Sequence, residues 1–133
     1  MAANTAMIEG LFNQPGYLAA KRLLDVTALR QQAIASNLAN LETPGYRRID
    51  VAPTFNDELQ RAIGTGDTTA LARLTPRLEV DRTAVASNPD GNTVQLESEL
   101  VKLQQNSLAH AVETQFISGS LARLRMAISG RSS

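Results

Sequence analysis

Apolar residues recur in alternating steps of four and three along two stretches of the chain, one near each end. This spacing averages 3.5 residues, which is the repeat of coiled-coil helices that supercoil around a neighbour. The sequence therefore predicts a mainly α fold, in which two long terminal helices form a coiled-coil or bundle core. The stripe residues with the strongest apolar character are Leu24, Ile34, Leu38 and Leu41 in residues 18–42, and Leu96, Leu100, Leu103, Ile117, Leu121, Leu124 and Ile128 in residues 94–128.

The C-terminal stretch also carries a second apolar line on another side of the helix. A helix with apolar lines on more than one side needs more neighbours than one intramolecular partner supplies. We therefore expect the chain to assemble into a helical bundle or polymer, and we expect the ends of the free subunit to be frayed until assembly buries them. The members of this second line are Val101, Leu108, Val112 and Met126.

Between the two helices lies an irregular segment that holds most of the prolines. Thr54 is expected to open a short helix that buries Phe55, Leu59 and Ile63, and Gly64-Thr65-Gly66-Asp67 is expected to end it. Residues 78–80 predict a short strand or hairpin arm, and Asn92 or Thr93 is expected to cap the C-terminal helix. The expected organisation is a flexible segment 1–17, a coiled-coil helix 18–42, the irregular segment 43–92, a coiled-coil helix 93–128 and a tail 129–133.

The stretch SNLANLETPGY, residues 36–46, marks the end of the first helix. Pro44 disfavours helical geometry at the residue before it. Pro44-Gly45 then suits the centre of a type II turn, because proline fixes φ and glycine accepts a positive φ. Tyr46 is expected to lie back on the helix end. Asn37 and Asn40 have no evident full use within one chain, which predicts contacts between their amides and a neighbouring chain.

Composition excludes several classes of function. The 133 residues contain 13 Lys plus Arg, 13 Asp plus Glu and no cysteine. A net charge of zero without a basic run disfavours nucleic-acid binding, and the missing cysteines exclude disulfide frameworks and thiolate zinc sites. No stretch approaches the roughly 18 apolar residues that a membrane helix needs, and the first 17 residues lack the charged start of a secretory signal.

No group of residues predicts catalysis, a cofactor or a metal. His110 is the only histidine, and a lone histidine on a coiled-coil stripe is more often a packed polar residue than a ligand or a general base. Glu97 and Glu99 face different sides of a helix, so they do not form a carboxylate pair for acid–base work. We therefore expect no enzyme.

The SNLANLETPGY string resembles the N-terminal signature of bacterial flagellar rod and hook proteins, in which an Asn-x-x-Asn helix end runs into Thr-Pro-Gly-Tyr. The resemblance covers residues 15–60 and 88–128, and within the family the short chain is most similar to the proximal rod proteins. Leu41-Glu42 and His110 depart from the usual residues of the family. The residues that match the family motif are Asn37, Asn40, Thr43, Pro44, Gly45 and Tyr46.

The resemblance implies a structural subunit of the proximal rod of the flagellar basal body, which polymerises through its terminal helices, transmits torque and forms part of the export channel. It implies a periplasmic location that is reached through the flagellar type III export apparatus without a cleaved signal. The implied partners are other copies of the chain, other rod proteins, the MS-ring protein and the FliE-type adaptor. The alternatives are another short proximal rod subunit, a helical adaptor or export chaperone of a type III system, and, least favoured, a small enzyme with an unrecognised site.

Overall fold

The protein is described from a computed structural model that covers residues 14–86 and 88–130, together with the single residues 6 and 10. Most of the expected N-terminal segment 1–17 and most of the expected tail 129–133 lie outside the described residues. The chain is mainly helical, with one small pair of strands in its middle. The fold class predicted from the sequence is therefore confirmed.

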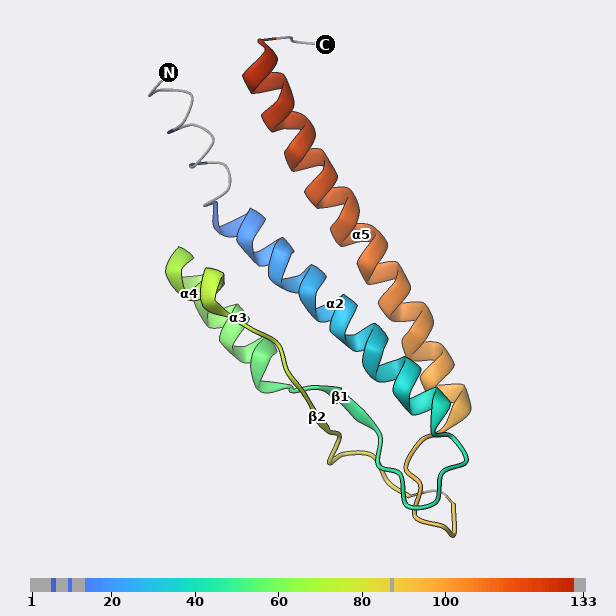
Figure 1. The fold of residues 1–133 in the computed structure, drawn as a ribbon. Helices are drawn as coiled ribbons and strands as arrows, with labels where there is room; N and C mark the ends of the chain where they lie inside the picture. The colour runs from blue at the N-terminus through green and yellow to red at the C-terminus, as the bar shows by residue number, and fades with distance from the viewer. Residues whose placement is uncertain (1–5, 7–9, 11–13, 87, 131–133) are drawn as a thin grey trace.

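Two long helices run antiparallel along the molecule (Figure 1). Helix α2 spans Pro15–Ala39, with proline in the first turn, where its missing N–H removes no helical hydrogen bond. Helix α5 spans Leu96–Ser129, a rod of 34 residues and about 50 Å. Among the described residues, neither helix has the length of apolar sequence that crossing a bilayer demands.

The middle of the chain folds back along the side of α2 that is remote from α5 (Figure 1). Strands β1 (Ile49–Val51) and β2 (Leu78–Val80) pair antiparallel, with Ile49 opposite Val80. Helices α3 (Thr54–Thr65) and α4 (Thr68–Arg73) lie between these strands in the sequence. The apolar core therefore lies between α2 and this middle layer, and its buried members are Leu18, Val26, Val51, Phe55, Leu59, Ala62 and Leu71.

Helix α3 confirms the predicted short helix, with one correction. It begins at Thr54 and buries Phe55 and Leu59, and Gly66 ends it in the left-handed conformation at φ 66°. Ile63, however, is exposed, and Ala62 takes the third buried position. The reason is the position of the core, because steps of four and three from Phe55 lead to residue 62 and place residue 63 one position farther around the helix.

The face of α5 that packs on α2 differs from its most apolar line. The less exposed positions include 99, 103, 106, 113, 117, 120 and 124. The predicted stripe shares Leu103, Ile117 and Leu124 with this face, whereas Leu96, Leu100, Leu121 and Ile128 are exposed. Within one chain, every second residue of α5 that packs on α2 therefore lies one position before the residue that the apolar pattern predicts. These residues are mostly polar.

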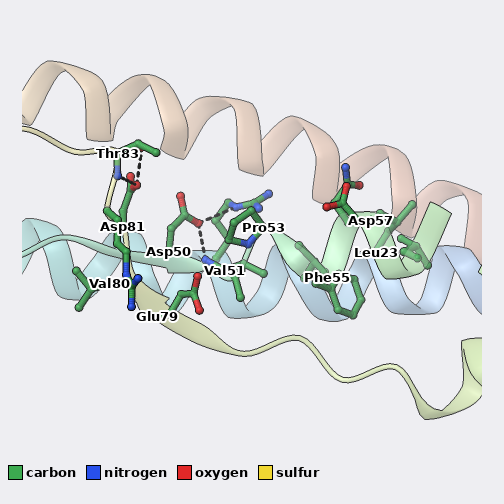
Figure 2. Close-up of a pocket in the computed structure, with 16 residues that line it drawn as sticks. Leu23, Asp50, Val51, Pro53, Phe55, Asp57, Glu79, Val80, Asp81 and Thr83 are labelled. Atoms are coloured by element: carbon green, nitrogen blue, oxygen red, sulfur yellow. Dashed lines mark hydrogen bonds and ion pairs between the residues drawn. The ribbon is translucent and has the colours of Figure 1, made fainter. Parts of the chain in front are cut away.

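A groove of about 750 Å³ opens between α2, α3 and the β1–β2 pair. Figure 2 shows its lining, with the ring of Phe55 at one end and Asp81 and Thr83 at the other. The groove lies on the middle-layer side of α2, and α5 contributes no residue to it.

Candidate assembly site

The end of α2 and the turn after it form the first part of the site. The last helical residue of α2 is Ala39. The side-chain Nδ2 of Asn40 donates to the carbonyl oxygen of Ser36 at 2.8 Å. The Tyr46 amide donates to the Thr43 carbonyl at 3.2 Å, and Gly45 between them has φ 72°. These values confirm the predicted turn, because a positive φ at its third residue defines type II.

Asn37 joins this turn to the rest of the molecule and has no exposed surface, at 0%. Its side chain pairs with the backbone of Ile49 as a strand would, since Oδ1 accepts from the amide at 2.9 Å and Nδ2 donates to the carbonyl at 2.9 Å. Oδ1 also accepts from the Tyr46 hydroxyl at 3.2 Å, and Nδ2 also donates to Glu99 at 3.3 Å. All four hydrogen-bonding positions of the amide are filled.

The expectation that the two asparagines lack full use within one chain is therefore wrong for Asn37, whereas Asn40 has partners among the described residues at two of its four hydrogen-bonding positions. Contacts of these amides with a neighbouring chain stay a prediction. Asn37 is saturated by internal partners, and Asn40 also accepts a hydrogen bond from the Thr43 hydroxyl at 3.1 Å. The physical reason is that the backbone after the turn comes back past the helix end, which the local sequence does not reveal. Tyr46 does lie back on α2 as expected, with its hydroxyl 3.0 Å from the Ser36 hydroxyl.

Asn92 closes the end of α2 from a distant part of the chain. Its Nδ2 donates to the carbonyl oxygens of Asn40, Leu41 and Thr43 at 2.9, 3.1 and 2.9 Å. These carbonyls follow a helix end, where acceptors lack intrahelical donors. The prediction that Asn92 or Thr93 caps α5 is wrong, because α5 begins at Leu96 and has no side-chain cap.

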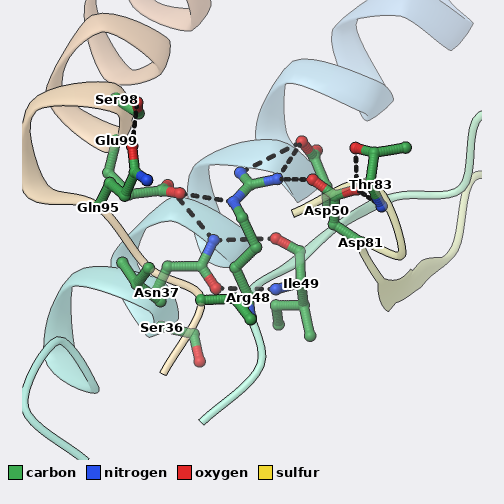
Figure 3. A network of polar contacts seen from close by, with 12 residues as sticks. Ser36, Asn37, Arg48, Ile49, Asp50, Asp81, Thr83, Gln95, Ser98 and Glu99 are labelled. Carbon is green, nitrogen blue, oxygen red and sulfur yellow. Dashed lines mark hydrogen bonds and ion pairs between the residues drawn. The ribbon is translucent and has the colours of Figure 1, made fainter. Parts of the chain in front are cut away.

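Arg48 is the centre of a buried ionic network that links β1, the segment after β2 and α5 (Figure 3). Its Nε donates to Glu99 at 2.6 Å, and its terminal nitrogens bind Asp81 and, at 3.4 Å, Asp50. Glu99 is fully buried, so its charge depends on Arg48 and Asn37 for compensation. We call Asn37, Arg48, Asp81, Asn92 and Glu99 the polar joint.

The electrostatics of the polar joint favour its ionised form. Burial alone would lower the pKa of Arg48, but hydrogen bonds to Glu99 and Asp81 outweigh that cost and hold the pKa above its usual range. Burial also tends to raise the pKa of Asp81, yet hydrogen bonds from Thr83 and Arg48 prevail, and the pKa lies below its ordinary value. Both shifts keep the ion pair charged at neutral pH.

Two further polar contacts follow along the α2–α5 interface. Asn106 donates to the carbonyl oxygen of Thr27 at 2.9 Å. The Thr27 hydroxyl lies 3.0 Å from a carboxylate oxygen of Glu113 and 3.1 Å from Nδ1 of His110, and burial raises the pKa of Glu113. Glu99, Asn106 and Glu113 recur every seven residues, so polar groups with fixed partners set the register of the two helices.

The structure brings the motif residues together but separates the stripe residues. The six motif residues lie in and around one turn, with Thr43, Pro44 and Gly45 exposed. On α2, Ile34 is buried, and Leu24 and Leu38 are half-buried. Leu41 follows the end of α2 and is half-buried as well. On the side of α5 away from α2, Leu108 and Val112 expose 68% and 62% of their surface. We call Val101, Leu108, Val112 and Met126 the outer stripe.

The site offers packing and hydrogen bonding rather than chemistry. Within the described residues, no three side chains of the His, Asp and Glu types are placed to hold a metal ion. Sequence reasoning missed the roles of Arg48, Glu99 and Asn106, since each works through a partner far away in the sequence. For Glu99 and Asn106, the sequence did carry a signal, because each is a charged or amide residue next to the apolar line of α5.

Comparison with known proteins agrees with this arrangement. Residues 24–47, which contain the end of α2 and the turn, match a family described as flagella basal body rod protein. The flagellar basal body rod protein FlgB of Borrelia hermsii is 34% identical over 113 residues, which cover 71% of this chain and 82% of that protein. FlgB of Escherichia coli K12 is 31% identical, over 74% of this chain and 81% of its own length.

A third relative extends the match over more of the chain. FlgB of Aquifex aeolicus is 30% identical, over 84% of this chain and 90% of its own. The matched family region contains Asn37 and the turn residues that Asn37 and Asn92 bind, and the other four residues of the polar joint lie outside it. The chain belongs to the FlgB family of flagellar basal body rod proteins.

Proposed function

We propose that the chain is a subunit of the proximal rod, which polymerises through its two long helices, transmits torque and forms part of the export channel. The observation that carries this proposal is the outer stripe of α5, which points away from α2 over several turns. Leu108 and Val112 are one helical turn apart on the same face, and large apolar side chains that are exposed together often mark a contact with another protein. Neighbouring subunits in a rod supply that contact.

The division of faces on α5 supports the same conclusion. Its inner face uses Glu99, Asn106 and Glu113 to fix the position of α2. Its exposed apolar side chains, the outer stripe among them, are left for neighbours, where burial is worth roughly 25 cal/mol per Å². A subunit built this way has a defined shape before assembly and buries further apolar surface afterwards.

The polar joint supports a role in transmitting force. It connects α2, β1 and α5 through charged and amide groups that are buried and mutually satisfied. Networks of this kind rigidify the structure around them. We further propose that the chain reaches the periplasm through the flagellar type III apparatus without a cleaved signal, and that it meets the MS-ring protein and the FliE-type adaptor at the rod base.

A pair of substitutions in the outer stripe tests the proposal. Leu108→Glu with Val112→Glu is expected to abolish motility in soft agar, because two charges would enter a buried subunit contact. The folded chain should be unaffected, since both side chains face away from α2 and are already exposed.

Circular dichroism of the purified variant and microscopy of basal bodies complete this test. The matched control Leu108→Met keeps volume and apolar character and should swim normally. Normal swimming by the doubly charged variant, with unchanged helix content, would show that the outer stripe is not an assembly surface.

A further inference from the structure

The groove between α2, α3 and the strand pair presents apolar side chains at its surface. Its floor contains Val26, Val51 and Phe55, which are buried in the core. Leu23 and Val80 also line it and expose 36% and 39% of their surface. A concave apolar surface with a polar rim is the usual form of a docking site for another molecule.

The rim of the groove is acidic. Its lining contains four carboxylates and two arginines. Asp50 and Asp81 are bound by Arg48, but within the described residues Asp57 and Glu79 take part in no ion pair. Figure 2 shows Asp57 and Glu79 among the residues that surround the groove. An occupant with positive charge is therefore favoured. The residues of the charged rim are Asp50, Asp57, Glu79, Asp81, Arg30 and Arg82.

The C-terminal end of α5 has the complementary chemistry. After Glu113 the chain contains no Asp or Glu, whereas arginines occur at 123 and 125 in α5 and again at 131. Leu121, Arg125 and Ile128 follow each other in steps of four and three, so they share one helix face. All three are exposed. This end is thus a basic helix whose apolar side chains Leu121 and Ile128 are exposed among the described residues.

The groove and this helix end lie on opposite sides of α2 in the same chain (Figure 1). We propose that the acidic groove of one copy binds the basic end of α5, residues 121–128, of a second copy. The contact joins two different surfaces, so it leaves one free groove and one free helix end in every pair. Such head-to-tail contacts propagate into open helical assemblies when the rotation between copies does not close a ring.

This inference rests on the proposed assembly of the chain into a rod and specifies one of the contacts. Leu108 and Val112 of the outer stripe lie outside residues 121–128, so substitutions at these two positions are separable by experiment from substitutions in the α5 end. Substitutions of Leu108 and Val112 test assembly itself. Substitutions of the charged residues in the groove and in the α5 end test only the contact between these two surfaces.

The native chain has no cysteine, so thiol pairs report this contact without background. Chains with Asp57→Cys and chains with Arg125→Cys are expressed together in a bacterium from which the native gene has been deleted, and restored swimming shows that they assemble. Basal bodies are then isolated and treated with a short thiol crosslinker. We expect crosslinks between the two kinds of chain to exceed those within either kind about tenfold, since a specific contact brings the two thiols within reach.

Glu58→Cys is the matched control, because residue 58 is exposed on the same helix but does not line the groove. It should crosslink to Arg125→Cys about tenfold less than Asp57→Cys does, because thiol pairing depends steeply on distance. Equal crosslinking from both positions would overturn the proposal. A product that joins Asp57→Cys to a different rod protein would also overturn it.

Charge reversal supplies a second measurement. For this measurement the thiols are placed at Asn56→Cys, which lines the groove, and at Ala122→Cys in the α5 end, and both positions are exposed. Arg123→Glu with Arg125→Glu should reduce crosslinking of this pair about tenfold, and so should Asp57→Lys with Glu79→Lys. A strain that carries all four substitutions should recover most of the loss, because the charges again attract. If recovery fails while the Leu108→Glu, Val112→Glu chain still loses assembly, the proposed function stands and the contact between groove and helix end is wrong.

Discussion

Replacement of Arg48 by leucine is expected to lower the free energy of unfolding by about 3–5 kcal/mol, the usual cost of removing one partner of a buried ion pair. Arg48 is 4% exposed, and Glu99, which it binds at 2.6 Å, is 0% exposed. Leucine would leave the Glu99 carboxylate buried without its cation, and Asp81 would lose a partner as well. Urea unfolding followed by circular dichroism measures the effect.

Arg47→Leu is the matched control for this prediction. Arg47 is the preceding residue in the chain but is exposed, so its replacement should change the free energy of unfolding by less than about 0.5 kcal/mol. Arg48→Leu combined with Glu99→Leu should regain much of the loss, because the unpaired buried charge is then gone. A single Arg48→Leu variant as stable as the native chain would show that the polar joint contributes nothing to folding.

Gly45→Val is expected to abolish motility. Gly45 has φ 72°, a conformation that a β-branched residue adopts only under strain. Its amide also donates to the Asp90 carbonyl at 2.9 Å, which ties the turn to the segment where Asn92 holds the end of α2. Strain at this residue would displace both segments. It would therefore change the direction in which α2 approaches neighbouring subunits. Swimming in soft agar is the measurement.

Two variants separate backbone strain from the added volume. Gly64→Val introduces the same side chain in α3, where the backbone has no positive φ and no atom lies within 4 Å of the new Cβ; it should swim. Gly45→Asn should retain partial motility, because asparagine tolerates the left-handed conformation better than valine does. Normal swimming by Gly45→Val would refute a structural requirement for this turn.

The sequence predicts the elements of this fold better than it predicts their contacts. The helices follow from the 3.5-residue repeat, and the turn follows from Pro44-Gly45, since both signals are local. The polar joint is different, because Arg48 and Glu99 are 51 positions apart. Arg48 belongs to no periodic pattern, Glu99 lies one position away from the apolar line of α5, and a charged residue is ordinarily placed on the surface.

The face of α5 illustrates a second limit. Periodicity identifies where apolar residues lie on a helix, but it does not say which line meets the partner within the chain. Here Glu99 and Asn106 form hydrogen bonds with residues of α2, while Leu100 stays exposed. Leu103, Ile117 and Leu124 of the predicted line lie on the less exposed face of α5, and burial of the other positions by neighbouring subunits stays a prediction.

An image of the basal body at side-chain resolution tests the central claim most directly. We expect this chain at the base of the rod, with Leu108 and Val112 of each copy buried against adjacent subunits and the polar joint intact within each copy. An image in which those two side chains face water, or in which the chain lies outside the rod, would contradict the account.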